Sequence, residues 1–437
     1  MANIDQKNVV DENKDKTQKE ITDAKHHHHH HHHNNKKTPG RKIRKFICKY
    51  RKRLIGISVI AVFALLLIFL ALFLDHKESL SQNEIGNYIN TETEAKSIQI
   101  EIPLFDEKIS LVHPAVTKYL DSENTDPVVK IYNQYIEAGR IDIGVPVEIS
   151  YKINGMPAGY SVKSSVIEVS ELDSFENSRV FSLNSNKNSV YVYFLKTNTL
   201  YYYRIKLTLS DDQVISTQGT FTTADTPRIL KIDGAYNVRD IGGWDTIYGK
   251  EISQGLLYRG TELDGAVEPS YSITSQGLKD MLTVLGIKTD MDLRPASDNE
   301  NGTDALGMNV EHIYFDAPMY RGVFNETRKE SVRKIFSELA DKNNYPVYLH
   351  CTYGLDRTGT ICYLLEALLG MNEEDLLKEY ELSAMYHGKV SDEMPNFITA
   401  IKELDGSTIQ DKVEGYLLSI GVTPAEITSI REIFLGK

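Results

Sequence analysis

The spacing of apolar residues changes at four places along the chain, and each change predicts a different kind of structure. Residues 1–53 are polar and charged without apolar periodicity, so we expect a disordered segment that ends in a basic stretch. Residues 54–74 form an uncharged apolar run, long enough for a helix that crosses the hydrocarbon core of a bilayer. Residues 75–95 are polar again and predict a stalk.

Residues 96–226 contain short runs rich in Val, Ile, Thr and Tyr, separated by Asn, Gly, Ser and Asp. Short strands with frequent turn residues predict an all-β sandwich domain. Leu195, Thr199 and Tyr201 stand at the spacing of the L-x-P-x-T-x-Y turn of fibronectin type III domains, which this stretch resembles, with Thr197 in place of the proline. The resemblance implies a ligand-binding domain or a structural spacer.

Residues 227–437 alternate between strand-like and helix-like patterns. Residues 275–286 and 326–341 place apolar side chains on one helical face, whereas 287–293 and 345–351 are short apolar strands. Such alternation is typical of an α/β domain with a central, mostly parallel sheet flanked by helices. Thr423, Pro424 and Glu426 form a capping box that predicts the start of a last helix.

The charge of the chain is unevenly distributed and bears on its location and partners. Residues 36–53 carry ten Lys or Arg and no acidic residue, so the net charge of -12 leaves the rest of the chain strongly acidic. An acidic body argues against nucleic acid as a partner. The basic flank precedes the apolar run, which predicts a single-pass cell-membrane protein with residues 75–437 outside the cell, in contact with the bilayer through residues 54–74.

Outside one short motif, described below, the cysteines and histidines of the sequence do not indicate a disulfide framework or a defined metal site. The three cysteines Cys48, Cys351 and Cys362 cannot form a disulfide framework. Cys48 is either a palmitoylation site or an ordinary cysteine, and Cys362 falls on an apolar helix as a core residue. The tract His26–His33 is interpreted as a purification tag or low-complexity segment, with transition-metal binding as the alternative.

The motif is HCTYGLDRTGT, residues 350–360, between a short buried strand and an apolar helix. A tight loop that enters a helix turns successive backbone N–H groups inward, and the helix start adds positive potential, so the loop suits phosphate. Arg357 adds a planar guanidinium that can bind two oxygens. Cys351 at the start of this loop is placed to attack phosphorus as a thiolate.

This motif resembles the H-C-x5-R-[ST] signature of cysteine-dependent protein tyrosine phosphatases. Its Asp-Arg-Thr-Gly ending resembles a bacterial subgroup of atypical tyrosine and dual-specificity phosphatases. Flanking stretches at 237–243, 255–263, 291–300 and 421–435 match that subgroup in order, so the resemblance covers about residues 228–437. It implies a cysteine-phosphatase fold for residues 227–437.

The resemblance also implies roles for individual residues. Cys351 would be the nucleophile, and Thr358 would bind its sulfur while His350 orients the loop. Asp356 would be the general acid, and Asp292 would position the arginine or share in proton transfer. Apart from the resemblance, Asp316 is an alternative acid on a loop after a predicted strand. The substrate-binding residues would be Thr352, Tyr353, Gly354, Leu355, Asp356 and Arg357. No metal or other cofactor is needed, because amides, guanidinium and thiolate supply the chemistry.

Two positions leave choices open. The subgroup has lysine where this chain has Leu355, which weakens the expectation of phosphoinositide hydrolysis and favours a phosphorylated protein or peptide. Arg239 and Arg259, in flanking motifs, either tie loops together through ion pairs or contact substrate. The leading hypothesis is a phosphotyrosine phosphatase that also acts on phosphoserine or phosphothreonine. The alternatives are an inositol phosphate or phosphoinositide phosphatase, and a catalytically inactive phosphate-binding or adhesion module.

Overall fold

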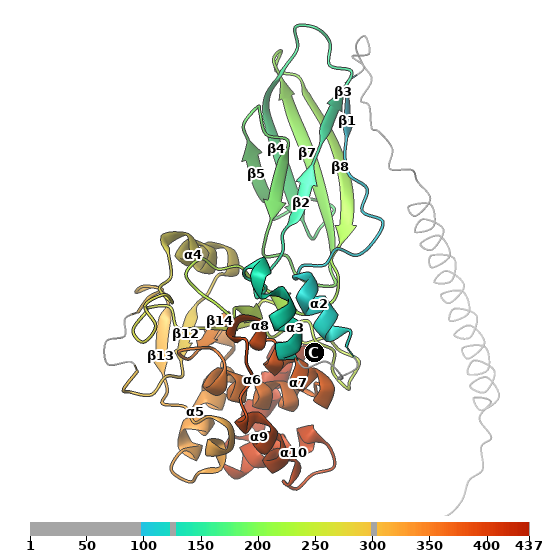
Figure 1. Cartoon of the computed structure of the whole chain (residues 1–437). Helices are drawn as coiled ribbons and strands as arrows, with labels where there is room; N and C mark the ends of the chain where they lie inside the picture. Colours follow the sequence, from blue (N-terminus) through green and yellow to red (C-terminus); the bar gives the residue numbers. More distant parts are fainter. Residues whose placement is uncertain (1–97, 123–127, 299–303, 437) are drawn as a thin grey trace, which may run out of the picture. The chain divides into compact units, whose positions relative to one another are not determined.

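The structure of the protein, a computed structural model, describes residues 98–122, 128–298 and 304–436 (Figure 1). All of these residues belong to one compact unit, Ile85–Lys437. The predicted disordered segment, membrane helix and stalk, residues 1–95, lie outside the described residues, together with the cysteine and the histidine tract that they contain.

The prediction of a single-pass membrane location, with the catalytic region outside the cell, is corrected by the structure. Within the part of the chain that the structure describes, every helix is too short or too polar to cross a membrane. The apolar run 54–74, on which the prediction depends, is not part of that description. Contact with a lipid bilayer through this run is likewise not supported.

Antiparallel strands dominate the N-terminal half. A four-stranded sheet has the order β5-β4-β7-β8, and two further pairs join β2 to β6 and β1 to β3. The strands are β1 (Gln99–Glu101), β2 (Val147–Ser150), β3 (Lys152–Asn154), β4 (Val162–Ser170), β5 (Arg179–Leu183), β6 (Ser189–Val192), β7 (Leu200–Leu209) and β8 (Val214–Thr222). Alternate residues of β7 are buried, as the pleat of a half-buried strand requires. The resemblance to fibronectin type III domains stays a prediction.

Two helices interrupt this β-rich half between β1 and β2. They are α2 (Pro114–Leu120) and α3 (Val128–Tyr135), followed by the short helix η1 (Ile136–Ala138). Their buried side chains belong to the hydrophobic core of the C-terminal half rather than to the core of the strands around them. The described residues from Val112 to Ile141 that are buried thus belong to the core of the C-terminal half.

The C-terminal half has one mixed sheet of six strands in the order β13-β12-β14-β11-β10-β9. The first four are parallel, while β10 is antiparallel to both of its neighbours. The strands are β9 (Arg228–Ile229), β10 (Arg239–Asp240), β11 (Leu257–Gly260), β12 (Thr289–Asp292), β13 (Glu311–Tyr314) and β14 (Val347–His350). This agrees with the predicted mostly parallel sheet.

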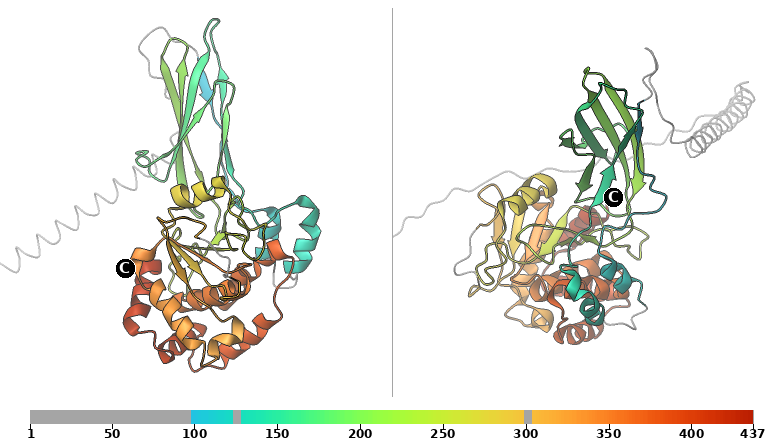
Figure 2. Two further views of the ribbon diagram at one scale, coloured as in Figure 1. Left: turned by 90° about the vertical axis from the view of Figure 1, so that its left-hand side faces the viewer. Right: turned by 45° about the horizontal axis from the view of Figure 1, so that its top comes forward.

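Helices cover both faces of this sheet (Figures 1 and 2). Val347 and Leu349 of β14 face the larger core, whereas Tyr348 between them faces the smaller one, so the strand is buried on both sides. The helices are α4 (Ser275–Lys279) with η2 (Asp280–Leu285), η3 (Tyr320–Phe324), α5 (Lys329–Leu339), η4 (Lys342–Asn344), α6 (Asp356–Leu369), α7 (Glu373–Glu381), α8 (Ala384–His387), α9 (Glu393–Lys402), α10 (Ile409–Ser419) and α11 (Pro424–Leu435). The capping box predicted at Thr423 is present at the start of α11.

Candidate active site

The predicted motif forms a loop between the central strand β14 and the start of α6. Cys351 is the first residue after the strand and is only 3% exposed. Helix α6 begins at Asp356 without a side-chain cap, so its first backbone N–H groups point into the loop without an intrahelical acceptor. The topology therefore places Cys351 and the positive end of a helix around the same small space.

Gly354 allows the loop to lie directly against strand β11. Its φ angle of 64° is left-handed, and a Cβ atom there would come within 2.4 Å of the carbonyl oxygen of Gly260. A residue with a side chain would require both a strained backbone and a displacement of β11. The glycine therefore fixes how closely the loop approaches the sheet.

Residues outside the loop donate hydrogen bonds to three consecutive carbonyl groups of the loop. The Thr352 carbonyl accepts from the backbone N–H of Glu262 at 3.1 Å, and the Tyr353 carbonyl accepts from His387 Nε2 at 2.8 Å. The Gly354 carbonyl accepts from Arg259 Nη2 at 2.9 Å and from Asn237 Nδ2 at 3.2 Å. Burial lowers the pKa of His387, so its neutral ring donates this bond.

The orientation of these carbonyls determines where the amides point. The N–H of a trans peptide is opposite to its C=O, so the N–H groups of Tyr353, Gly354 and Leu355 face away from the scaffold. None of the N–H groups of residues 352–357 has an acceptor among the described residues. A row of unpaired amides beside a helix start is an oxyanion-binding cradle.

Arg357 lies on the first turn of α6 beside this cradle. Its Nε atom donates to the carbonyl oxygen of Ala317 at 3.2 Å. Neither of its Nη atoms is hydrogen-bonded or ion-paired to any residue that the structure describes. The guanidinium is therefore held at one edge, and its other donors are available for oxyanions.

Arg239 and Arg259 are buried and share the carboxylate of Glu379 on α7. Arg239 Nε and Arg259 Nη1 each lie 2.6 Å from one of its oxygens. Burial raises the pKa of Glu379, but the two guanidinium groups outweigh it and lower the pKa, so the group is a carboxylate. Of the two open interpretations, ion pairs that tie loops together describe both arginines, and Arg259 also holds Gly354 of the loop.

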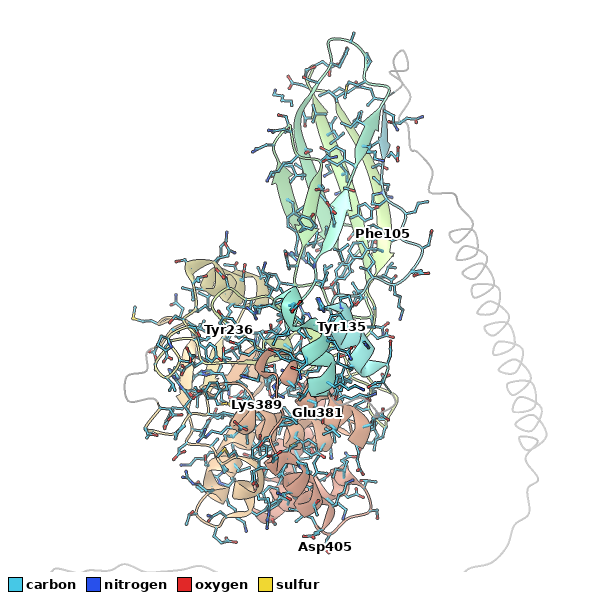
Figure 3. The ribbon with its side chains drawn as sticks, in the orientation of Figure 1. Phe105, Tyr135, Tyr236, Glu381, Lys389 and Asp405 are labelled. Carbon is cyan, nitrogen blue, oxygen red and sulfur yellow. The ribbon has the colours of Figure 1, made fainter. Side chains whose placement is uncertain are left out.

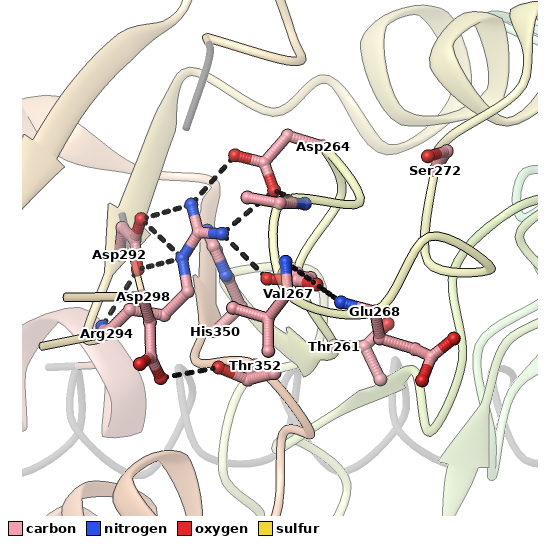
Figure 4. Close-up of polar contacts among 12 residues, drawn as sticks. Thr261, Asp264, Val267, Glu268, Ser272, Asp292, Arg294, Asp298, His350 and Thr352 are labelled. Atoms are coloured by element: carbon pink, nitrogen blue, oxygen red, sulfur yellow. Dashed lines mark hydrogen bonds and ion pairs between the residues drawn. The ribbon is translucent and has the colours of Figure 1, made fainter. Parts of the chain in front are cut away.

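Asp292, an alternative candidate acid, lies in a separate buried network (Figure 4). Arg294 Nη2 contacts its Oδ2 at 2.7 Å, and the same guanidinium pairs with Glu262 and Asp264. The backbone N–H of Arg294 donates to its Oδ1 as well. Burial raises the pKa of Asp292, but the cations around it, His350 first, outweigh burial and hold the pKa well below its usual range.

This network reaches the loop through Glu262, whose N–H binds the Thr352 carbonyl. The Thr352 hydroxyl also donates to Asp298 at 3.2 Å. The Asp292 carboxylate, paired with Arg294 and close to His350, is ionised and has no proton to donate. The geometry of Asp292 therefore fits positioning better than acid catalysis.

His350 is a buried cation next to Cys351. Its Nε2 lies 3.0 Å from Oδ1 of Asp290 on the neighbouring strand β12. Burial lowers the pKa of His350, but Asp290 and Asp292 outweigh it and raise the pKa to about 9. The proton on this ring stabilises the fold while it is bound, because the charged imidazole is paired.

Stability is expected to fall with rising pH because of this proton. The contribution of His350 is complete below the ordinary histidine pKa of 6.5 and is lost as the pH rises through about 9. One proton gives a slope of about -1.4 kcal/mol per pH unit within that window. Thermal unfolding measured from pH 6.5 to 9 should show this decline, and His350→Asn should remove about this part of it. The part due to His312, whose bond to Asp292 also raises its pKa to about 9, should remain. An unchanged slope in the variant would contradict the assignment.

Asp356 is oriented by tyrosines that are distant in sequence. The hydroxyl of Tyr320 donates to its Oδ1 at 2.5 Å, and the Tyr380 hydroxyl lies 2.7 Å from that of Tyr320. Tyr320 adopts a φ angle of 50°, unusual for a tyrosine, and its N–H binds the hydroxyl of Thr360. One carboxyl oxygen of Asp356 is thus fixed, and the other is left for a reacting group.

The other predicted residues are placed less directly. Asp316 is 40% exposed at its side chain and pairs with Arg328 at 2.7 Å. The Thr358 hydroxyl is buried without a hydrogen-bond partner among the described residues, so its predicted bond to the sulfur is not formed here. Cys362 is fully buried, and burial raises the pKa of its thiol.

Several residues of the site were not expected from the sequence. Tyr320, His387 and the Ala317 carbonyl carry no motif, and only the folded chain brings them to the loop. Asn237 and Arg259 lie within recognised motifs, but their contact with loop carbonyls could not be inferred from spacing.

Comparisons with known proteins agree on the C-terminal half. Residues 230–436 match the family model described as "Tyrosine phosphatase family". A tyrosine-protein phosphatase of Nostoc commune is 27% identical over 206 residues, which span 36% of this chain and 69% of that protein. The family-model match begins after the β-rich half.

Two solved structures are also similar to this chain. One is the core catalytic domain of the PP-IP phosphatase SIW14 from S. cerevisiae in complex with citrate, at 17% identity and a TM-score of 0.27, covering 40% of this chain and 94% of that chain. A second structure of the Siw14 catalytic core has 13% identity and a TM-score of 0.27, covering 46% of this chain and 98% of that chain.

The loop geometry and the family match support a cysteine-type phosphatase. Within that class, residues 230–436 are similar to the tyrosine phosphatase family in its atypical form.

Proposed function

We propose that this protein hydrolyses phosphotyrosine through a phosphocysteine intermediate formed on Cys351. Phosphoserine and phosphothreonine are secondary substrates in this proposal. The amides of residues 352–357 and the guanidinium of Arg357 bind the three non-bridging phosphoryl oxygens. Asp356 serves as general acid and base, with Tyr320 as its positioning residue.

The reaction proceeds in two displacements at phosphorus. In the first, the Cys351 thiolate forms the S–P bond while the bond from phosphorus to the tyrosyl oxygen breaks, and Asp356 gives that oxygen its proton. In the second, the Asp356 carboxylate takes a proton from water, the water oxygen forms a new P–O bond, and the S–P bond breaks. The thiolate and the protonated acid are restored, and inorganic phosphate leaves.

The arrangement of the loop carbonyls is the observation that supports this function most strongly. Five hydrogen bonds from four donors outside the loop hold the carbonyls of Thr352, Tyr353 and Gly354 outward, so the amide cradle exists before an oxyanion binds. A preorganised cradle around a buried cysteine stabilises the charge of a phosphoryl transition state without reorganisation.

The rim of the loop favours an aromatic ester over a polyanionic one. The side chain of Tyr353 is 43% exposed and meets Tyr271 and His387 edge to face, at centroid distances of 6.1 and 5.9 Å. Leu355 supplies no charge where the related subgroup has lysine. Aromatic rings beside the cradle suit a phenyl leaving group better than a ring of phosphates.

Relative rates on a panel of substrates test this proposal. The panel contains a phosphotyrosyl peptide, a phosphoseryl peptide, phosphoinositide vesicles, inositol polyphosphates and p-nitrophenyl phosphate, without added metal and with vanadate as inhibitor. We expect the phosphotyrosyl peptide to give the highest kcat/KM. Faster release of phosphate from inositol polyphosphates or phosphoinositides would favour the inositol alternative. No hydrolysis of any ester, with phosphate still bound, would indicate an inactive binding module.

The role of Asp356 predicts a dependence on the leaving group. Asp356→Asn should lower kcat by about 10²-fold or more on phenyl phosphate, whose leaving group needs a proton, and by much less on p-nitrophenyl phosphate. Tyr320→Phe should change the two rates in the same unequal way but less strongly, because the acid remains and only its orientation is lost.

A matched variant controls for the loss of a buried hydroxyl. Tyr345→Phe removes a hydrogen bond to the Leu339 carbonyl in the core, far from Asp356 in the hydrogen-bond network. It should lower thermal stability without a leaving-group dependence. Equal losses on both esters in Asp356→Asn would exclude this residue as the acid, and the same experiment on Asp316→Asn would then identify the alternative.

A further inference from the structure

Residues 112–122 and 128–142 contact residues that hold the loop, although this segment lies outside the family match. Apolar residues of α2, α3 and the turn after them belong to the same core as Leu349, Cys351 and Leu355. They are Ala115, Val116, Tyr119, Val128, Ile131 and Ile141. Since the family match begins at residue 230, this packing is a feature of the chain beyond the matched region.

Asp142 is the polar end of this contact. Its side chain is 4% exposed, and Oδ2 accepts from the backbone N–H of Asn237 at 3.2 Å. Arg140 binds the same carboxylate through Nε at 3.0 Å and Nη2 at 2.7 Å. The guanidinium of Arg140 also lies over the ring of Tyr236, 4.3 Å from its centroid.

Asn237 connects Asp142 to the loop. Its φ angle of 53° is left-handed, a conformation that costs free energy for a residue with a side chain. Its side-chain Nδ2 donates to the carbonyls of Tyr353 and Gly354, at 3.4 and 3.2 Å. Asp142 binds the backbone N–H of this strained residue and therefore stabilises the conformation that directs its amide toward the loop.

A second contact from the same segment reaches the other loop donor. Tyr132 of α3 packs on Gly388, where an added Cβ would come within 2.6 Å of its ring. Gly388 follows His387, which binds the Tyr353 carbonyl. Six residues before His387, at the end of α7, the carboxylate of Glu381, labelled in Figure 3, accepts a hydrogen bond from the hydroxyl of Tyr119 of α2. The segment thus contacts Asn237 itself and the residue next to His387, the two side chains that donate to the Tyr353 carbonyl.

We propose that residues 112–122 and 128–142 are a positioning element of the phosphate-binding loop and that Asp142 is its positioning residue. Asp142 fixes Asn237, and Asn237 fixes two loop carbonyls, so the opposite amides point at the phosphoryl group. The part of the chain beyond residue 230 is then not self-sufficient for full activity. This inference rests on the proposed function for its kinetic readout, and on oxyanion binding for an independent one.

Substitution of Asp142 in the full chain tests the inference. Asp142→Ala should lower kcat per titrated active site by about tenfold or more, because a displaced loop loses transition-state contacts. The inhibition constant of vanadate should rise in parallel. Asp142→Asn should recover most of both quantities, because an amide oxygen can still accept from the Asn237 N–H. Glu137→Ala, which removes an exposed acidic side chain of the same segment, should leave both unchanged.

A second variant keeps the test valid if Asp142→Ala does not fold. Arg140 is 34% exposed at its side chain, so Arg140→Gln removes the bidentate contact at little cost to the core. It should raise the vanadate inhibition constant about threefold, a smaller loss because Asp142 remains. Wild-type kcat and vanadate inhibition in every Asp142 and Arg140 variant that folds, even with a lowered melting temperature, would overturn the inference and leave the proposed function intact.

Failure of the proposed function would give a different result. The wild-type chain would then hydrolyse none of the phosphate esters, and no kinetic comparison among variants could be made. Calorimetric titration with vanadate alone would still decide the inference, since the Asp142→Ala chain should bind this oxyanion more weakly than wild type. Equal affinities in that titration would overturn it.

Discussion

Replacement of Cys351 by serine is expected to lower kcat on a phosphotyrosyl peptide by about 10⁵-fold or more, because this replacement removes the nucleophile itself. A hydroxyl loses its proton far less readily than a thiol and is the poorer nucleophile at neutral pH. The amide cradle is unchanged, so affinity for the peptide should be retained within a few-fold. Steady-state kinetics and calorimetric titration measure the two quantities.

Cys362 provides the matched control for this substitution. It lies on the same helix as Arg357, is fully buried, and belongs to the hydrophobic core. Cys362→Ala should lower the melting temperature slightly and leave kcat per folded molecule near the wild-type value. Activity that survives in Cys351→Ser, or that is lost only in Cys362→Ala, would contradict the assignment of the nucleophile.

Arg357→Lys is expected to lower kcat by about 10³-fold, although the positive charge is kept. Lysine lacks the planar pair of N–H donors that binds two phosphoryl oxygens, and it cannot also donate to the Ala317 carbonyl from a fixed plane. KM should rise less than kcat falls, because the charge on the oxygens is largest in the transition state.

A surface arginine gives the comparison for this variant. Arg328 pairs with Asp316 through an exposed ion pair and forms no hydrogen bond or ion pair with a described residue of the loop. Arg328→Lys should change kcat by less than about twofold. If Arg357→Lys proves as active as Arg328→Lys, the guanidinium of Arg357 does not bind the phosphoryl group.

The sequence predicts much of the C-terminal fold because its strands and helices have strong local signals. The predicted strand at 345–351 contains β14, and the apolar helix predicted after the motif is α6. Residues 275–286 form a helix whose second half is a π-helix, a local variation that apolar spacing does not reveal. The periodicity of a helix and a run of β-branched residues both lie within a few consecutive residues, so they can be recognised in the sequence.

The N-terminal half was harder to predict for a physical reason. The Tyr-rich strand β7 is one of the short runs that predict a β domain, but β4 and β5 carry polar residues that obscure their alternation. Helices α2 and α3 are short and pack on a core formed by residues that are far away in sequence. Their stability comes from that tertiary contact rather than from their own sequence pattern.

In the candidate site, too, residues that are adjacent in sequence could be predicted, whereas residues that are distant in sequence could not. Cys351, Arg357 and the loop between them are adjacent in sequence, so one motif identifies them. The partners that orient the loop, such as His387, Asn237 and Tyr320, are brought there by the fold. Asp292 illustrates the opposite case, because the sequence identifies the residue, whereas its ion pair with Arg294 is visible only in the structure.

Direct detection of the phosphorylated enzyme tests the central claim, that Cys351 takes the phosphoryl group inside the amide cradle. The Asp356→Asn chain, in which breakdown of the intermediate is slowed, is quenched during turnover of p-nitrophenyl phosphate, whose leaving group does not need the proton of Asp356, and mapped by mass spectrometry. Cleavage after Arg357 separates Cys351 from Cys362. We predict one phosphoryl group on the peptide that contains Cys351 and none on the peptide that contains Cys362. A phosphoryl group on any other residue would contradict the account.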